Sequence, residues 1–290
     1  MQKTKAQHFL PRCFLKWFTN NHNQIYFYDK KNKKISDARN IKSVATIKHL
    51  YTIFDDDKKD MCVEKSFEKI ETSIAPVLKK IAKTNLQNIT NQELEQLIQF
   101  IVVLTYRTPE TPSIAEKIIN SKSAYTFAPP VPKSEKIKLV KELKSKPGTA
   151  YAIALQYLIS PKYKELIHNC DVLLQTSDIP LIVNDRYMCL EKLAEDISTA
   201  EGELNLQNVK LHYPINKNNC ITLLPKENTE KLRTKDIDIT IKPLNNKKTY
   251  LINFLTAQQA NNYFYASTPN QINSIAEQLK AGTTKNPSAV

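Results

Sequence analysis

VLLQT (residues 172–176) and PLIV (residues 180–183) open a series of short apolar segments that decides the fold class. The series continues with VKLHYP (residues 209–214), CITLL (residues 220–224) and IDITI (residues 237–241). β-Branched residues recur in all of these segments, as expected for strands. Because most of the segments follow one another without room for a helix-length crossover, the sequence predicts a mostly antiparallel sheet in the C-terminal half.

Helical periodicity surrounds this series. Apolar residues recur at helical spacing over residues 63–81, where Pro76 predicts a kink or a break. A capping motif at Thr90 starts a second amphipathic helix. Two further helices are expected at residues 245–264 and 269–280. The predicted fold class is therefore α+β, with a helical N-terminal and middle region packed on the C-terminal sheet.

The domain organisation is expected to be a single globular unit or two closely packed subdomains, since 290 residues suffice to bury a large core. Residues 1–128 hold an N-terminal helix that begins near Pro11, a hairpin and the first long helices. Residues 133–282 hold further helices and the sheet, after a proline cluster at residues 129–132. Residues 283–290 are expected to form a flexible tail.

Composition excludes several classes of protein. Only 3 glycines occur, so the glycine-rich loops of P-loop and Rossmann nucleotide-binding sites are excluded. The 5 cysteines never form a CxxC motif, which favours free thiols in a reducing, cytoplasmic compartment. No apolar stretch approaches the roughly 18 residues of a membrane span, and none has the form of a signal peptide. The net charge of +13 attracts polyanions such as nucleic acids, membrane surfaces and acidic partners.

Short motifs follow one another in a recognisable order. HFLPRCFLKWF (residues 8–18) is followed by RTP (residues 107–109) at a helix end, SDIP (residues 177–180) between two strands, and YP (residues 213–214) before another strand. Together they resemble a widespread bacterial family classed as a domain of unknown function, whose members open with a His-x-x-Pro-Arg/Lys string. The resemblance covers roughly residues 7–265 and implies a bacterial cytosolic protein. The residues that it singles out are His8, Arg12, Arg107, Ser177 and Asp178.

The candidate catalytic residues are His8, Arg12, Arg107 and Asp178. An imidazole exchanges protons near neutral pH and a guanidinium holds phosphate, so His8 and Arg12 suit phosphoester or nucleotide chemistry. Arg107 would project into a cleft as a second anion ligand, and Asp178 would orient the imidazole. Structural roles are the open alternative: Arg12 would pair with a carboxylate such as Glu71, and His8 would bond to a backbone carbonyl. Arg107 would then cap its helix, and Asp178 would stabilise a turn.

Other candidates are weaker. Glu64, Glu68 and Glu71 recur on one helix face and are weak candidates for a metal site, to which Asp178 would contribute. The same spacing is ordinary for a solvated helix face, so a divalent metal stays an open alternative and no cofactor is predicted. Ser177 is disfavoured as a nucleophile because no glycine-flanked elbow surrounds it.

These observations lead to three hypotheses. The first is a nucleic-acid-directed hydrolase, a ribonuclease or related phosphodiesterase of the bacterial toxin or antiviral defence type, with a histidine as general acid or base and arginines on the phosphate. The second is a non-catalytic protein that binds a nucleotide or a partner through the same arginines. The third is an interaction protein whose polar motifs only lock the fold. The sequence does not distinguish RNA, DNA and nucleotides, and it indicates no particular protein partner.

Overall fold

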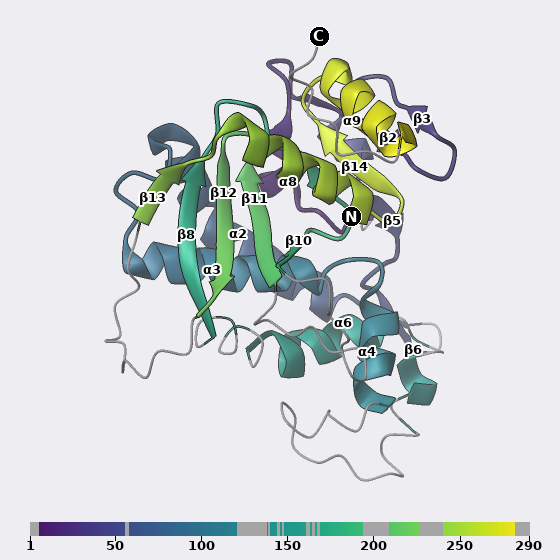
Figure 1. Ribbon diagram of the computed structural model, residues 1–290. Coiled ribbons are helices and arrows are strands. Elements are labelled where there is room, and N and C mark those ends of the chain that lie inside the picture. Colours follow the sequence, from purple (N-terminus) through teal and green to yellow (C-terminus); the bar gives the residue numbers. More distant parts are fainter. Residues whose placement is uncertain are drawn as a thin grey trace.

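A five-stranded sheet forms the centre of the computed structural model, in the order β10-β11-β12-β8-β13 (Figure 1). Its strands are β8 (Cys170–Thr176), β10 (Cys189–Lys192), β11 (Val209–Asn216), β12 (Asn219–Pro225) and β13 (Thr240–Pro243). Neighbouring strands are antiparallel except for β13, which runs parallel to β8. The prediction of an α+β fold with a mostly antiparallel C-terminal sheet is confirmed.

The structure describes residues 6–55, 58–120, 138, 140–143, 146, 148–160, 163, 166, 169–193, 209–226 and 240–281. The proline cluster at residues 129–132, the expected tail at residues 283–290 and the first part of the strand expected at residues 237–241 lie outside the described residues. Within the described residues, every helix is too short or too polar to cross a lipid bilayer.

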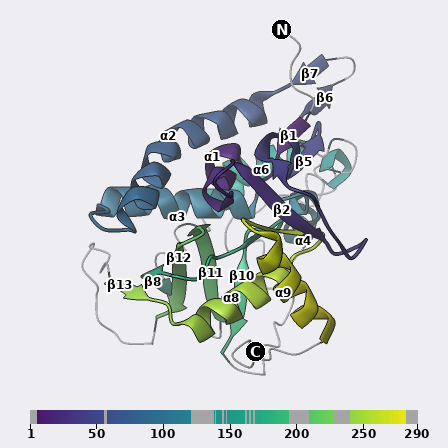
Figure 2. The ribbon, with the colours of Figure 1, turned by 90° about the horizontal axis from the view of Figure 1, so that it is seen from above.

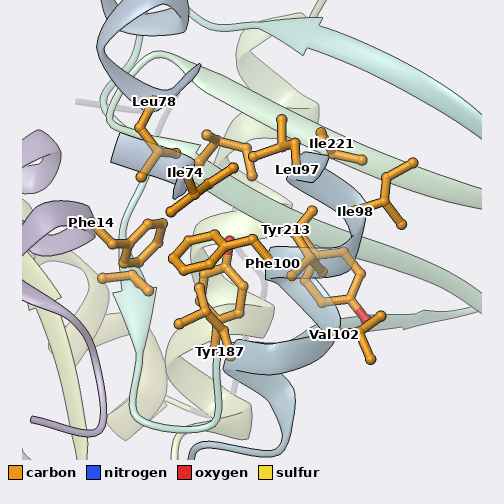
Figure 3. Packing of buried hydrophobic residues seen from close by; sticks show 14 of the residues in the cluster. Phe14, Ile74, Leu78, Leu97, Ile98, Phe100, Val102, Tyr187, Tyr213 and Ile221 are labelled. Carbon is orange, nitrogen blue, oxygen red and sulfur yellow. The ribbon is translucent and has the colours of Figure 1, made fainter. Parts of the chain in front are cut away.

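Helices cover both faces of the central sheet. α2 (Cys62–Thr84) and α3 (Asn91–Thr105) pack on one face, and α8 (Asn246–Gln259) crosses the other (Figures 1 and 2). The larger core lies between the sheet and the α2–α3 layer, where the rings of Phe14 and Tyr187 meet edge to face with centres 4.9 Å apart (Figure 3). Each large apolar side chain buried there contributes about 1.5–3 kcal/mol of transfer free energy. This core fixes the α2–α3 layer relative to the sheet.

Helix α2 continues through Pro76, so of the predicted kink or break the break is wrong. Pro76 itself is exposed, whereas Ile74, Val77 and Leu78 beside it are buried in the core. Burial of these side chains outweighs the cost of a proline inside a helix, which is about 3 kcal/mol. Tertiary packing therefore decided the conformation at this position.

A second sheet joins the two ends of the chain, in the order β3-β2-β14-β9. β2 (Gln24–Asp29) pairs with β14 (Tyr263–Ala266), which pairs with β9 (Val183–Asn184). β3 (Lys34–Ile35) and β4 (Arg39–Asn40) both pair with β2. Because strands from the N-terminal and C-terminal regions are neighbours, the described residues form a single globular unit.

The chain reverses after α8, where the sequence predicted that the helix continues to residue 264. The helix ends at Gln259. The buried carboxylate of Asp185 then accepts hydrogen bonds from the backbone N–H groups of Asn261, Asn262 and Tyr263, at 2.7–3.0 Å. The predicted continuation is wrong because this turn directs the following aromatic residues into β14, where they pair with β2.

The other elements of the structure are short or lie outside the two larger sheets. The helix predicted near Pro11 is confirmed as a short α-helix followed by a 3-10 turn, and the strand before it pairs with a strand some forty residues later. The remaining elements are β1 (Ala6–His8), α1 (Arg12–Leu15), η1 (Lys16–Phe18), η2 (Ile41–Ser43), β5 (Thr46–Lys48), β6 (Ile53–Asp55), β7 (Lys58–Asp60), α4 (Thr111–Asn120), α6 (Gly148–Ile153), η4 (Ala154–Leu158) and α9 (Pro269–Ala281).

A polar network fastens α8 to the central sheet. His212 is buried on β11, with Nε2 at 2.7 Å from Glu191 Oε2 and Nδ1 at 2.7 Å from the Thr222 hydroxyl. Lys248 on α8 binds the same Glu191 oxygen. The hydrogen bond with His212, together with the bond and charge of Lys248, lowers the pKa of Glu191 to about 2.

Left-handed backbone conformations fall on residues other than glycine. Lys33, in the loop between β2 and β3, has a φ of 51°. A Cβ in this region costs roughly 1–2 kcal/mol, which glycine avoids. The described residues of this kind are Asn23, Lys33, Ala45, His49, Asn85, Leu86, Asn88 and Tyr187.

Replacing Lys33 with glycine is expected to raise the free energy of unfolding by about 1 kcal/mol, because the strain at the Cβ disappears. Chemical denaturation of the purified variant measures the change. Lys34→Gly is the matched control, since Lys34 lies in β3, and we expect it to lower stability by about 0.5–1 kcal/mol. Equal destabilisation by the two substitutions would contradict the assignment of strain to Lys33.

Stability is expected to fall on acidification because the pKa of Glu191 is depressed. Such a carboxyl stabilises the fold above its unfolded pKa of 4.5, and the contribution is lost as the pH falls toward about 2. Glu191→Gln should cost on the order of 2 kcal/mol at pH 7 and flatten the pH dependence between those values, as measured by urea denaturation. The exposed Glu68→Gln is the control. An unchanged acid slope in Glu191→Gln would refute this account.

Candidate functional site

Arg107 follows the C-terminal end of α3 in the sequence, and it is only 2% exposed. Its Nη1 lies 2.7 Å from Glu71 Oε1 on α2, an ion pair. Its Nε–H points to the backbone oxygen of His8 at 3.1 Å and to the Tyr51 hydroxyl at 3.2 Å. The guanidinium also lies 4.4 Å from the centre of the Phe67 ring. All of these partners are internal.

Tyr51 completes this cluster. Its hydroxyl lies 3.1 Å from the backbone oxygen of His8 and 3.0 Å from that of Arg107, so its proton bridges β1 and the end of α3. Gln7, the residue before His8, accepts a hydrogen bond from the Tyr51 backbone. The cluster therefore fixes the backbone of His8 in place. The expectation that Arg107 projects into a cleft as an anion ligand does not match this structure.

The imidazole of His8 is held in one orientation. Its Nε2 lies 3.1 Å from the backbone oxygen of Ile41 in η2. A carbonyl oxygen only accepts, so Nε2 carries a proton, and in the neutral ring the lone pair is on Nδ1. Burial lowers the pKa of His8, and the charges of Arg12 and Arg107 lower it further, against the raising effect of the Ile41 bond. The alternative that His8 bonds to a backbone carbonyl is confirmed.

We call the surface around His8 and Arg12 the exposed corner, and Arg12 is a cation on it. It is the first residue of α1, it is exposed, and its side chain makes no hydrogen bond or ion pair with any residue that the structure describes. Its charge nevertheless acts on the imidazole of His8. The alternative that Arg12 pairs with Glu71 is wrong, because Arg107 occupies that carboxylate.

An open groove runs beside this corner, between α1, η1 and α2. Cys13 and Lys16 line one side, and Glu68, Thr72 and Lys79 line the other. The Cys13 sulfur lies 3.9 Å from a carboxylate oxygen of Glu71. Burial, and then the Glu71 charge, raise the pKa of the Cys13 thiol to about 12, so the thiol stays protonated and is a poor nucleophile.

Asp178 lies elsewhere, exposed on the loop after β8, and the structure contains no contact between it and His8. Its neighbour Ser177 donates to the backbone oxygen of Ile179 at 2.7 Å and lies 2.9 Å from the Thr249 hydroxyl on α8. Ser177 thus stabilises the turn of the SDIP motif, whereas the structural alternative assigned that role to Asp178, for which no hydrogen bond with a described residue is seen. The orienting role predicted for Asp178 is wrong, because the Ile41 carbonyl holds the ring instead.

The three α2 carboxylates do not converge. Glu68 is exposed, Glu71 is paired with Arg107, and burial raises the pKa of Glu64, whose Oε2 has no hydrogen-bond partner in the part of the chain that the structure describes. Among the described residues, no group of three or more His, Cys, Asp or Glu side chains is arranged to hold a metal ion. The weak prediction of a metal site on these glutamates therefore gains no support.

Replacing Arg107 with alanine is expected to lower the free energy of unfolding by about 3–5 kcal/mol, because Glu71, the backbone oxygen of His8 and the Tyr51 hydroxyl lose a buried partner. Chemical denaturation measures the loss. Arg186→Ala is the control, since Arg186 is 38% exposed and its Nε lies 3.4 Å from Glu110, and it should cost less than about 1 kcal/mol. Similar small losses of unfolding free energy in both variants would show that Arg107 does not hold these elements together.

Comparison with known proteins identifies a family. The family model described as a protein of unknown function (DUF4238) matches residues 6–270. No curated protein and no solved structure gives a significant match. The predicted resemblance to a family of unknown function over residues 7–265 is confirmed, since the match covers nearly the same residues. Because it spans most of the sequence, the chain belongs to the DUF4238 family of proteins of unknown function.

Proposed function

We propose that this chain is a ribonuclease in which His8 is the general base and Arg12 stabilises the phosphate. One observation carries the proposal: the Ile41 carbonyl fixes the tautomer of His8 and leaves the lone pair on Nδ1, and the ring lies within the electrostatic reach of Arg12, a guanidinium without a partner among the described residues. Fixing an imidazole through its second nitrogen is how general bases are commonly oriented. The predicted catalytic set is thereby reduced to two side chains that act directly.

RNA fits this pair better than DNA because RNA carries its own nucleophile. Nδ1 of His8 takes the proton of a ribose 2′-hydroxyl, and that oxygen forms a bond to the adjacent phosphorus. Arg12 stabilises the charge that develops on the phosphate oxygens. The bond from phosphorus to the 5′ oxygen breaks, and the imidazolium returns its proton to that leaving oxygen. The products are a 2′,3′-cyclic phosphate and a 5′-hydroxyl end.

Arg107 serves this reaction as a positioning residue. Its Nε–H donates a hydrogen bond to the backbone oxygen of His8, so Arg107 determines where the His8 ring lies. Its charge also keeps the pKa of His8 low, after burial, which is the larger cause. A neutral imidazole at pH 7 is the form that a general base requires.

A second candidate is a protein that binds RNA without cleaving it. Among the described residues, only His8 and Arg12 of the predicted set face the exposed corner, and no separate side chain there serves as the acid. In that case Arg12 still contacts a phosphate, and the imidazole adds a hydrogen bond. The toxin or defence setting belongs to the ribonuclease candidate, where expression in bacteria should arrest growth as RNA is lost.

The test is cleavage of a labelled RNA and of the same sequence in DNA by the purified chain. RNA alone should be cut, with cyclic phosphate ends, and the rate should rise with pH below about 6.5 and level off near neutrality because the pKa of His8 is lowered. His8→Ala should reduce kcat by about 10²–10⁴-fold. Arg12→Ala should reduce it by about 10²–10³-fold.

His22→Ala is the matched control, because His22 is an exposed histidine in the turn before β2. Its rate should equal that of the unmodified chain. Melting temperatures of all variants separate lost chemistry from lost folding, and His8→Gln keeps a donor for the Ile41 carbonyl if His8→Ala is unstable. RNA that binds tightly but stays intact would favour the second candidate, and neither binding nor cleavage would sink both.

A further inference from the structure

Exposed cations are concentrated in the stretch that includes β3, β4, η2 and β5. None of them forms an ion pair with a residue that the structure describes, and the carboxylate of Asp37 is the single acidic group between the first and the last of them. Helix α9, which packs against β2 and β3, adds one acid and one base, Glu277 and Lys280. We call these cations the basic edge, and they are Lys33, Lys34, Arg39, Lys42 and Lys48.

The strand pairing sets two of these cations, Lys34 and Arg39, out along the outer side of β2. In the strand register, Lys34 of β3 stands opposite Asp29 at one end of β2, and Arg39 of β4 stands opposite Ile25 near the other end. The two positions are four residues apart along β2, a distance of roughly 14 Å at the rise of a strand. One strand of a nucleic acid duplex carries about four phosphates over that length. The spacing therefore suits a phosphate backbone lying along the edge.

The basic edge leads directly to the proposed site. Lys42 lies in η2, and Ile41 immediately before it accepts the hydrogen bond from the His8 ring. Lys48, in β5, lies on the strand that pairs with β1, where Lys48 stands opposite Ala6 and Thr46 opposite His8. A backbone bound along the edge thus continues toward the imidazole and Arg12.

We propose that the basic edge binds the phosphate backbone of RNA and holds it for cleavage at His8, an inference that rests on the proposed ribonuclease function. The contacts are with phosphates, so binding is independent of base sequence and depends strongly on salt. The exposed lysines and arginine act as point charges, and the β2 edge supplies their spacing.

The test uses a 2′-O-methyl oligonucleotide, which lacks the nucleophile and stays intact whether or not the chain is a ribonuclease. The triple variant Lys34→Glu, Arg39→Glu and Lys42→Glu is compared with the control triple Lys65→Glu, Lys69→Glu and Lys83→Glu on the exposed face of α2. Both triples change the charge equally. Fluorescence anisotropy at several salt concentrations gives Kd and its salt dependence for each protein.

The edge variant should bind at least tenfold more weakly at 0.1 M salt, and its plot of log Kd against log salt should lose a slope of about 2, at about 0.7 for each phosphate contact. With cleavable RNA, KM should rise while kcat stays unchanged. The control triple should lose much less affinity. Melting temperatures establish that both variants are folded.

Equal weakening in the two triples would overturn the proposal, because net charge alone would then explain the binding. The proposal would also be overturned if the unmodified chain did not bind the oligonucleotide but bound vesicles containing phosphatidylserine, and if the edge variant lost affinity for those vesicles. Absence of cleavage with specific loss of oligonucleotide binding would remove the ribonuclease function and keep the edge as an RNA-binding surface.

Discussion

The buried ion pair between Arg107 and Glu71 is the constraint on which the N-terminal half of the structure depends. A guanidinium that is 2% exposed is costly to bury, and it is tolerated here because its partners come from three elements: α2, β1 and the segment containing Tyr51. The same residue that joins α3 to α2 also holds the backbone of His8. The contacts of Arg107 therefore stabilise both the packing of the helices and the position of His8 in the candidate site.

Elements with a strong local signal were predictable. The helix from Thr90 has the capping box that its sequence indicated, and β11 and β12 follow their apolar segments. The helix predicted through residue 264 failed because β14 depends on pairing with β2, at the far end of the chain. Periodicity reports only local preference, whereas Asp185 and β2 decide this segment through long-range hydrogen bonds.

The candidate site was predictable only in part, for a related reason. His8 and Arg12 are close in sequence, so their proximity in the structure was expected. The group that orients His8 is the backbone carbonyl of Ile41, and a carbonyl leaves no mark on residue type. Arg107 was misassigned because an arginine at a helix end has the same sequence appearance whether it meets a ligand or a buried glutamate.

A net charge of +13 says little until the cations with internal roles are set aside. Lys30 donates to three carbonyls at the end of α8, Lys80 pairs with Glu93, and Lys248 pairs with Glu191. The cations of the basic edge have no such partners among the residues that the structure describes, so their positive potential is open to a ligand. Their attraction is long-ranged and screened by salt, whereas the basicity of His8 depends on burial and on one hydrogen bond. In the proposed function, affinity for RNA thus depends on the charges of the basic edge, and cleavage depends on the basicity of His8. Salt therefore changes mainly the affinity, and pH changes mainly the cleavage rate.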